Sequence, residues 1–383
     1  FPVHKPPTQS IFRKKVAAYA KHFVGDGGTT KGVNENNTVT NMHELLSIHM
    51  PAYDDSIIKG VASIMASYSS WNGRKMHADH DLVTGFLKDW QGIDSLTSPP
   101  HANYTYSVET RILAGVDMVM VPYNFTEFIN DLTYLVKNNF IPTDRIDDAV
   151  ERILSPDQRG WEPAFVVLVS IQEHRNLARE AVRKSLVLLK NGKTASNPLL
   201  PLPKKMSRIL IAGSHADNLG YQCGGWTITW QGFSGNDATS GIELHLQERT
   251  TILGAIKSAV DPGTEVIYVE NPDSKYATSS GFDYAIVVVG EHTYAESAGD
   301  SPTLTMADPG LDVINSVCQS VKCVVIVISS RPLILEPYLL SIDALGFTGK
   351  LPRTLFRTVD QLPMNVGDPY YDPLFPFGFG LTA

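Results

Sequence analysis

The order of apolar and polar residues in the first half of the chain predicts short buried strands followed by amphipathic helices. Continuous apolar runs bounded by polar or glycine-containing loops predict the strands, and apolar residues three and four positions apart predict the helices. The predicted strands are 16–24, 62–67 and 116–121, and the predicted helices are 125–136, 145–154 and 173–190. The last helix is expected to stop at Asn191-Gly192, since glycine commonly follows a helix end.

A proline-rich segment over 197–205 separates this half from the next and is predicted to form neither helix nor central strand. Beyond it, valine- and isoleucine-rich runs alternate again with helical patterns. The predicted strands are 208–212, 265–269, 284–289 and 324–329, and the predicted helices are 251–260 and 311–317. Strands that are apolar throughout, separated by helices, are typical of a parallel sheet covered on both faces.

Composition narrows the class of protein. With 383 residues and 43% hydrophobic residues, the chain is expected to form two or three folded domains rather than a disordered segment. The 40 acidic residues outnumber the 32 basic ones, and no run of five Lys or Arg occurs, which argues against nucleic-acid and membrane-surface partners. The longest apolar runs are far too short for a membrane-spanning helix.

Cysteine and histidine spacing predicts no metal site. The three cysteines lack zinc-site spacing, and Cys318 and Cys323 form either a small disulfide or two buried reduced thiols, which spacing alone does not decide. His77 and His80 are expected to be solvated loop histidines. The sequons at Asn36, Asn103 and Asn124 favour secretion. The abrupt start without an apolar leader suggests a piece of a longer chain.

Carboxylates, aromatic and basic residues lie on or after predicted strands, after one helical stretch (Asp89-Trp90) and in a glycine-rich loop (Trp226 to Trp230). They include the segments Lys21-His22, Tyr68 to Trp71, Asp89-Trp90, Trp226 to Trp230, and Glu291 to Glu296. Ligands bind where parallel strands end, and tryptophan faces suit a sugar ring. Two carboxylates about 5 Å apart are suited to retaining glycoside hydrolysis. Taken singly, each such residue is more typical of a loop cap, a solvated charge or a core side chain.

The longer strings around these residues resemble glycoside hydrolase family 3, most closely its plant β-D-glucan exohydrolases and β-glucosidases. The strings are KHFVGDG at 21–27, GVNENNT at 32–38, SYSSWNG at 67–73, KSLVLLKNG at 184–192, GYQCGGWT at 220–227 and QLPMNVGD at 361–368. The resemblance covers most of the chain and implies an α/β fold, a partial (β/α)8 barrel followed by a mostly parallel α/β sandwich. The implied boundaries are 1–154 for the barrel, 155–205 for an unmatched segment, helix and linker, and 206–383 for the sandwich.

The resemblance also implies a function and a set of site residues. The family is secreted, works in the extracellular space (the cell wall or apoplast in plants), needs no cofactor and releases glucose from the non-reducing ends of β-glucans or β-oligoglucosides. Asp89 matches the nucleophile and Glu296 the acid/base. Substrate-binding positions are matched by Lys21, His22, Glu35, Tyr68, Trp90, Trp226 and Trp230. Cys318 and Cys323 match a family disulfide.

The chain departs from the family pattern at several places, which leaves a second hypothesis open. About four barrel strands are expected before Lys21, a strand is expected between Lys88 and Asp89, and a helix and sheet segment are expected after Leu345. The segment 155–170 has no counterpart, and 241–249 is expected to be an insertion. The alternative is therefore a catalytically inactive truncated remnant that at most binds sugar. Neither hypothesis predicts an oligomeric state.

Overall fold

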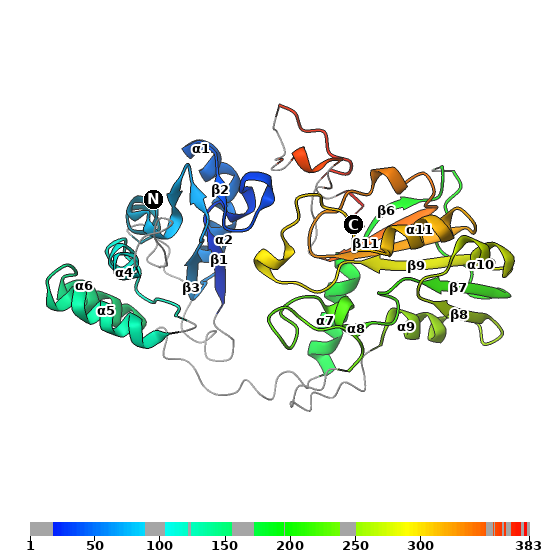
Figure 1. The fold of residues 1–383 in the computed structure, drawn as a ribbon, viewed down its shortest axis with the longest axis horizontal. Helices are drawn as coiled ribbons and strands as arrows, with labels where there is room; N and C mark the ends of the chain where they lie inside the picture. Colours follow the sequence, from blue (N-terminus) through cyan, green and yellow to red (C-terminus); the bar gives the residue numbers. More distant parts are fainter. Residues whose placement is uncertain are drawn as a thin grey trace. The chain divides into compact units, whose positions relative to one another are not determined.

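The chain folds as two compact units, Phe1–Ile171 and Gln172–Ala383, in the computed structural model (Figure 1). The structure describes residues 18–88, 104–121, 124–154, 172–194, 196–237, 250–349, 355, 357–361, 364, 369–376 and 379–380.

Short strands form the centre of the first unit. β1 (Tyr19–Phe23) pairs in parallel with β3 (Ser63–Ala66), and the register shifts between Lys21 and Phe23. A second small sheet joins β2 (Asn37–Thr38), β4 (Ser70–Trp71) and β5 (Arg74–Lys75). Phe23, Ile64 and Leu45 are buried in the core that packs around these strands. The strands predicted over 16–24 and 62–67 are thus confirmed over the residues that the structure describes.

Helices and helical turns surround these strands. The short segments are η2 (Asp26–Gly28), η3 (Thr30–Gly32), α1 (Met42–Glu44), η4 (Leu45–His49), η5 (Met76–Ala78) and η6 (Asp81–Lys88), and the longer helices are α2 (Pro51–Ile58), α4 (Tyr104–Leu113), α5 (Phe125–Lys137) and α6 (Thr143–Ile153). α1 begins with a capping box, in which the Asn41 side chain accepts from the Glu44 amide. The predictions of helices over 125–136 and 145–154 are confirmed by α5 and α6.

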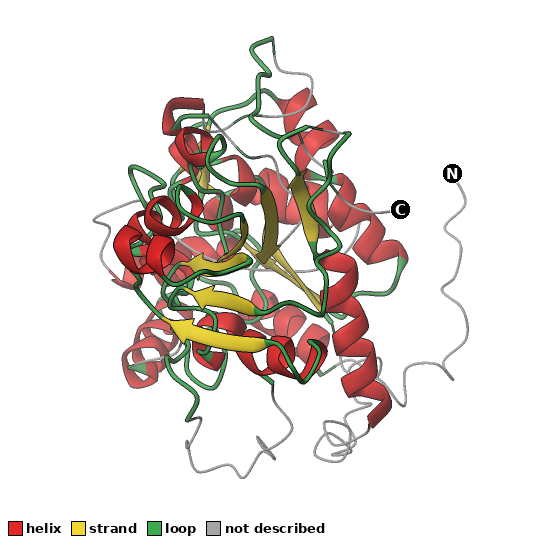
Figure 2. Ribbon diagram, turned by 90° about the vertical axis from the view of Figure 1, so that its right-hand side faces the viewer, coloured by secondary structure: helices red, strands yellow, loops and turns green. Residues whose placement is uncertain are grey.

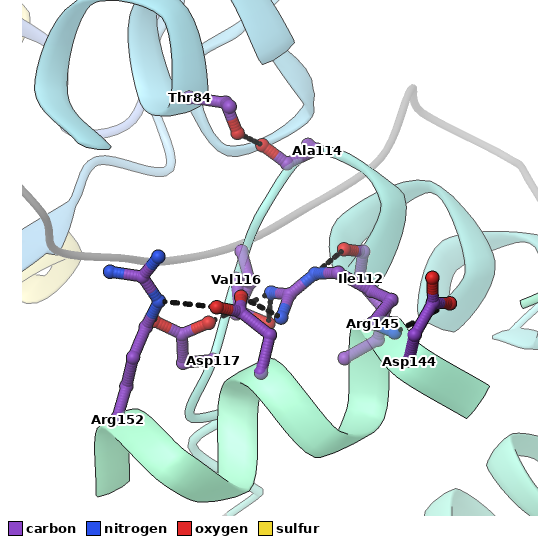
Figure 3. A network of polar contacts seen from close by, with 9 residues as sticks. Thr84, Ile112, Ala114, Val116, Asp117, Asp144, Arg145 and Arg152 are labelled. Atoms are coloured by element: carbon purple, nitrogen blue, oxygen red, sulfur yellow. Dashed lines mark hydrogen bonds and ion pairs between the residues drawn. The ribbon is translucent and has the colours of Figure 1, made fainter. Parts of the chain in front are cut away.

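The strand predicted over 116–121 is wrong. This segment has no regular structure, and its backbone is held by a side chain instead, since Arg145 Nη2 donates to the Val116 carbonyl at 2.6 Å (Figure 3). The same guanidinium pairs with Asp117 Oδ1 at 3.0 Å. An apolar run forms a strand only where a neighbouring strand can pair with its backbone groups. None of the described strands pairs with residues 116–121.

A six-stranded sheet forms the second unit, in the order β6-β11-β10-β9-β7-β8. Its strands are β6 (Val187–Asn191), β7 (Arg208–Ala212), β8 (Glu265–Val269), β9 (Tyr284–Gly290), β10 (Cys323–Ser329) and β11 (Ala344–Gly349). All neighbours are parallel except β6 and β11, which are antiparallel. Every residue of the central strand β9 is buried. The expectation of a mostly parallel sheet is confirmed.

Helices cover both faces of this sheet, as Figure 2 shows from the side of the second unit. The helices are α7 (Gln172–Ser185), α8 (Leu219–Cys223), α9 (Ile252–Ala259), α10 (Ser274–Ser279) and α11 (Gly310–Cys318), with turns η11 (Glu296–Gly299), η12 (Glu336–Tyr338) and η13 (Val359–Gln361). Val287 shares a core with Val313 of α11, whereas its strand neighbour Val288 shares the opposite core with Leu253 of α9. This alternation is the period-2 pattern of a strand buried on both faces.

The helix predicted over 173–190 is too long. α7 ends at Ser185, and Val187–Asn191 is the strand β6, which pairs with β11 about 150 residues further along. Three apolar residues of this segment, Leu177, Val182 and Leu186, are exposed. The tertiary pairing with β11 therefore decides the structure of this segment against its helical periodicity.

β11 runs straight through the Leu345-Gly346 junction, where a family segment is expected to be missing. Leu345 and Gly346 stay in register with Val325 and Ile326 of β10. Against β6, however, the register shifts between these same two residues. The junction is thus accommodated by a bulge on one side of a continuous strand.

The disulfide between Cys318 and Cys323 is confirmed. The two Cα atoms are 5.2 Å apart, and the bond connects the end of α11 to the start of β10. Cys223 is exposed and takes no part in a disulfide. The predicted insertion at 241–249 and the unmatched segment 155–170 lie outside the described residues.

Candidate functional site

A hydrogen-bonded group of polar side chains lies at the end of β1. His22 Nδ1 is 3.1 Å from Asp26 Oδ2, and the Ser67 hydroxyl donates to Asp26 Oδ1 at 2.9 Å. Partial burial raises the pKa of Asp26, but the hydrogen bonds from His22 and Ser67 and the charges of His22 and Lys21 outweigh it, so the pKa is lowered. Asp26 is therefore ionised and orients His22. Lys21 itself is exposed on the same strand.

Tyr68 follows β3 and lies against a buried histidine. Its ring meets His77 edge to face, with 5.7 Å between the ring centroids, while 37% of Tyr68 stays exposed. His77 is completely buried, and its Nδ1 is 2.8 Å from the Ser67 carbonyl oxygen. Burial, and then the charges of Arg111 and Lys75, lower the pKa of His77 to about 2, so it is neutral. The expectation that His77 is a solvated loop histidine is wrong, whereas His80 is exposed.

Glu35 lies beside the same strand ends with an exposed side chain and a left-handed backbone, at φ +60°. Lys75 Nζ connects the two segments, because it donates to the Tyr68 carbonyl at 2.6 Å and to the Glu35 carbonyl at 3.3 Å. The Glu35 carboxylate is thus on the surface of the first unit. Asp89 and Trp90, predicted as nucleophile and subsite residue, lie outside the described residues.

The two predicted sugar-binding tryptophans share a tight loop in the second unit. The amide of Trp226 donates to the Trp230 carbonyl at 2.9 Å, and the side chains of both residues are about half exposed, at 47% and 58%. Trp226 and Ile228 have left-handed φ angles of +57° and +67°. Gly225 is needed where the loop touches its neighbour, since a Cβ there would lie 2.0 Å from the Tyr294 carbonyl oxygen.

Glu296 begins η11, a short distance after β9. It has a left-handed φ of +52° and is partly buried. Non-glycine residues rarely adopt this conformation, and the surroundings must hold them in it. Such residues cluster at active sites. The backbone at Glu296 therefore supports a functional assignment that does not depend on any sequence resemblance.

Gln231 connects the tryptophan loop to the Glu296 loop. Its side-chain oxygen accepts from the Ala295 amide at 2.8 Å, and its side-chain nitrogen donates to the Ala295 carbonyl at 3.4 Å. Trp226, Trp230 and Glu296 are thus brought together on two loops that are directly hydrogen-bonded. Lys21, His22 and Tyr68 are brought together in the first unit.

A pocket of about 260 Å³ opens beside these loops within the second unit. Its lining includes Tyr221, Trp226, Glu291, His292, Tyr294 and Ser329. The His292 ring stacks on the Tyr221 ring with 5.1 Å between their centroids, and the centroid of the Tyr221 ring lies 4.8 Å from that of His215. Aromatic faces next to hydroxyl groups and a carboxylate are chemically suited to a sugar ring.

Several site residues were missed by the sequence analysis. Asp26 lies only four residues after His22, but this spacing predicts a side-chain contact on a helix and not at the end of a strand. Ser67, Gln231 and Arg331 carry no local signal, because the site residues that they contact, Asp26, Ala295 and Glu291, are 40 or more residues away. Within the described ranges, no group of three His, Cys, Asp or Glu side chains is placed to hold a metal ion. In those same ranges, no helix has both the length and the apolar character needed to cross a membrane.

Two models of one protein family match the chain. The Glycosyl hydrolase family 3 N terminal domain matches residues 8–155, and the C-terminal domain of the same family matches residues 186–346. A curated relative, the lysosomal beta glucosidase of Dictyostelium discoideum, is 27% identical over 95% of this chain and 51% of its own length. The periplasmic beta-glucosidase of Salmonella typhimurium is 24% identical over 97% of this chain and 59% of its own.

Solved structures of a glucanase and of a beta-glucosidase superpose on the chain. A variant of the exo-1,3/1,4-beta-glucanase from a Pseudoalteromonas species superposes with a TM-score of 0.75 at 33% identity, over 95% of this chain and 64% of that one. The beta-glucosidase from Listeria innocua superposes with a TM-score of 0.75 at 20% identity, over 97% of this chain and 59% of that one, which supports the fold. The chain thus spans between about half and two thirds of the length of these relatives.

Proposed function

Since the chain belongs to glycosyl hydrolase family 3, we propose that it is a retaining glycoside hydrolase that releases glucose from the non-reducing ends of β-glucans or β-oligoglucosides. The observation that supports this most is the left-handed Glu296, hydrogen-bonded through Ala295 and Gln231 to the loop that carries two exposed tryptophans. An acid residue beside aromatic faces that accept a sugar ring is the arrangement that this reaction needs.

In the proposed mechanism, the reaction takes two displacements at the anomeric carbon. The Asp89 carboxylate attacks that carbon, the bond to the leaving oxygen breaks, and Glu296 gives its proton to that oxygen. In the second step, Glu296 takes a proton from water, the water oxygen bonds to the anomeric carbon, and the Asp89 carboxylate leaves. The sum is one glucoside and one water converted to glucose and an alcohol.

In the proposed substrate site, Lys21, His22, Tyr68 and Trp90 bind the terminal glucose, Glu35 supports it, and Trp226 and Trp230 clamp the next sugar. The ionised Asp26 beside His22 supports part of this assignment, because it holds the imidazole in one orientation for a sugar hydroxyl. The exposed tryptophan faces support the other part.

We also propose that the protein works in a secretory or extracellular compartment. The Cys318–Cys323 disulfide supports this, because disulfides persist in oxidising compartments. Asn36 and Asn124, which lie in two of the sequons, are exposed, while Asn103 lies outside the described residues. The named relatives in this family include lysosomal and periplasmic enzymes.

The test of the proposed function is hydrolysis of phenyl β-D-glucoside, whose leaving oxygen needs a proton, by the wild-type protein and by the variants Asp89→Asn and Glu296→Gln. We expect each variant to lose about 100-fold or more in kcat/KM, because each removes a group that forms or breaks a bond. The matched control is Glu265→Gln, a surface carboxylate of the same unit that pairs with Arg208. Activity that survives both site substitutions would overturn the assignment of these two residues.

The second candidate function is sugar binding without hydrolysis, which the exposure of Trp226 and Trp230 favours. Under this alternative, a β-glucan oligosaccharide shifts the tryptophan fluorescence of the wild-type protein, and no glucose is released at any pH. Release of glucose that depends on Glu296 would exclude it.

A further inference from the structure

The loop that carries Glu296 is bracketed by one arginine from a different strand. Arg331 follows β10, and its Nη2 forms a close ion pair with Glu291 Oε1 at the start of the loop. Its Nη1 donates to the Gly299 carbonyl at 2.5 Å at the end of the loop. One planar guanidinium therefore fixes residues on both sides of Glu296, which a single-point cation would not do.

The start of the loop is anchored at the end of β9, whose residues are all buried. Glu291 follows β9 directly, and only 5% of its side chain is exposed. Its second carboxylate oxygen accepts from the Ser329 hydroxyl at 2.6 Å and from the Tyr294 hydroxyl at 2.7 Å. Every oxygen of this buried carboxylate thus has a donor, as a buried charge requires.

The middle of the loop is held by the same arginine and by Gln231. The Arg331 guanidinium lies 5.6 Å from the centroid of the Tyr294 ring, which is a cation–π distance. Gln231 holds Ala295, the buried residue immediately before Glu296, by two hydrogen bonds to its backbone. The unfavourable left-handed backbone at Glu296 is therefore flanked by fixed points on both sides.

We infer that Arg331 and Gln231 are positioning residues, which hold Glu296 where it delivers its proton to the leaving oxygen. This inference rests on the proposed function of Glu296. A misplacement of the acid by about 1 Å is enough to cost on the order of 100-fold in rate. The two residues touch no reacting atom in this scheme and act only through the backbone on either side of the acid.

The test compares two substrates that differ in their need for the acid. Phenyl β-D-glucoside needs its leaving oxygen protonated, whereas 2,4-dinitrophenyl β-D-glucoside leaves without a proton, and kcat/KM reports the step in which that group departs. We expect Arg331→Lys, which keeps the positive charge beside Glu291, to lower kcat/KM for the phenyl substrate at least about 10-fold more than for the dinitrophenyl substrate. Gln231→Met is expected to act in the same direction.

The matched control is Arg208→Lys in the same unit. Arg208 pairs with Glu265, donates to the Ser280 carbonyl at 2.7 Å and lies 5.4 Å from the Phe282 ring, so it makes the same three kinds of contact away from Glu296. We expect this control to leave the ratio of the two substrates unchanged. A loss of the same factor on both substrates in Arg331→Lys and Gln231→Met would mean a general loss of folded protein and would overturn the inference.

A second readout separates this inference from the proposed function. Hydrogen exchange at the amides of Ala295 to Gly299 is expected to be at least about 10-fold faster in Arg331→Lys than in the wild-type protein, and unchanged in Arg208→Lys. Unchanged exchange in Arg331→Lys would overturn the positioning role even if the enzyme is active. A wild-type protein that releases no phenol from either substrate would overturn the proposed function, whatever the exchange shows.

Discussion

The two units satisfy their backbone hydrogen bonds in different ways. In the second unit, six strands pair along most of their length around the fully buried β9. In the first unit, the described ladders are short, and side chains supply many of the bonds. Examples are the Thr38 hydroxyl to the Gly25 carbonyl at 2.6 Å and the Trp71 indole to the Thr40 carbonyl at 2.8 Å. We infer that the first unit depends on such side-chain bonds because its ladders are short, whereas the second has an extended sheet with a buried central strand in addition to its own side-chain bonds.

The largest expected effect that tests this contrast is the loss of Arg145 in the first unit. Its side chain is only 15% exposed, pairs with the largely buried Asp117, and donates to the carbonyls of Ile112 and Val116 (Figure 3). Arg145→Met would leave a largely buried carboxylate without this partner, so we expect the free energy of unfolding of the first unit to fall by about 3 kcal/mol. Urea unfolding is monitored by hydrogen exchange at the backbone amides of α4 and β9, so that the free energy of unfolding of each unit is measured separately.

Arg152→Met is the matched control for this change. Arg152 pairs with the same Asp117 and with Asp148, but 42% of its side chain is exposed, so we expect a loss below about 1 kcal/mol. Equal losses of unfolding free energy in the two variants, or a loss measured in β9 of the second unit, would show that the Arg145 guanidinium is not a main source of the stability of the first unit.

The next effect is a different acid sensitivity of the two units. His77 and His215 are buried and neutral, because burial is the main cause that lowers their pKa to about 2 and about 4. In the unfolded chain, a histidine has a pKa of about 6.5. Below that pH the unfolded chain binds a proton that the folded unit does not, so stability is complete above pH ~6.5 and falls as the pH drops. Each histidine lowers the free energy of unfolding of its unit by about 1.4 kcal/mol per pH unit over this range.

The two units are expected to diverge below pH ~4. The contribution of His215 to the stability of the second unit stops falling there, whereas the contribution of His77 to the stability of the first unit continues to fall toward pH ~2. His77→Gln keeps a side-chain donor for the Ser67 carbonyl and removes the titration, so the first unit should lose about 2 kcal/mol less between pH 7 and pH 5 than in the wild-type protein. An unchanged pH slope of the first unit in this variant would contradict the buried neutral state of His77.

The same contrast explains which elements could be predicted from the sequence. β7 and β8 match the predicted ranges, because each is a compact run of mostly apolar residues with clear boundaries. Four of the five residues of β7 are buried, whereas the edge strand β8 is only partly buried. β6 could not be distinguished from a continuation of α7, because its strand character depends on the distant β11. The strand predicted over 116–121 is wrong because this apolar run has no strand to pair with among the described residues.

The same distinction between local and distant partners applies to the residues of the candidate site. His22 and Trp226 could be proposed as site residues because they lie in contiguous strings that resemble a family, and Glu296 because it matches the acid/base of that family. Their supporting residues could not, because the hydrogen bonds that hold them cross 41 residues between Asp26 and Ser67 and 64 between Gln231 and Ala295. Contacts of that separation leave no periodicity in a single sequence, and only the folded chain brings the partners together.

The smallest expected effect concerns the disulfide of the second unit. Cys318 and Cys323 are only five positions apart, and both are buried beside β10, so the bond closes a short loop in a region that is already well packed. Replacing both by Ala should lower the free energy of unfolding of the second unit by about 2 kcal/mol, because short loops restrict the unfolded chain least. The stability of the first unit should not change, and Cys223→Ala, at an exposed cysteine outside the disulfide, should change the stability of neither unit. If the double variant fails to fold, the second unit depends on its covalent link rather than on its sheet, and the contrast between the two units is wrong.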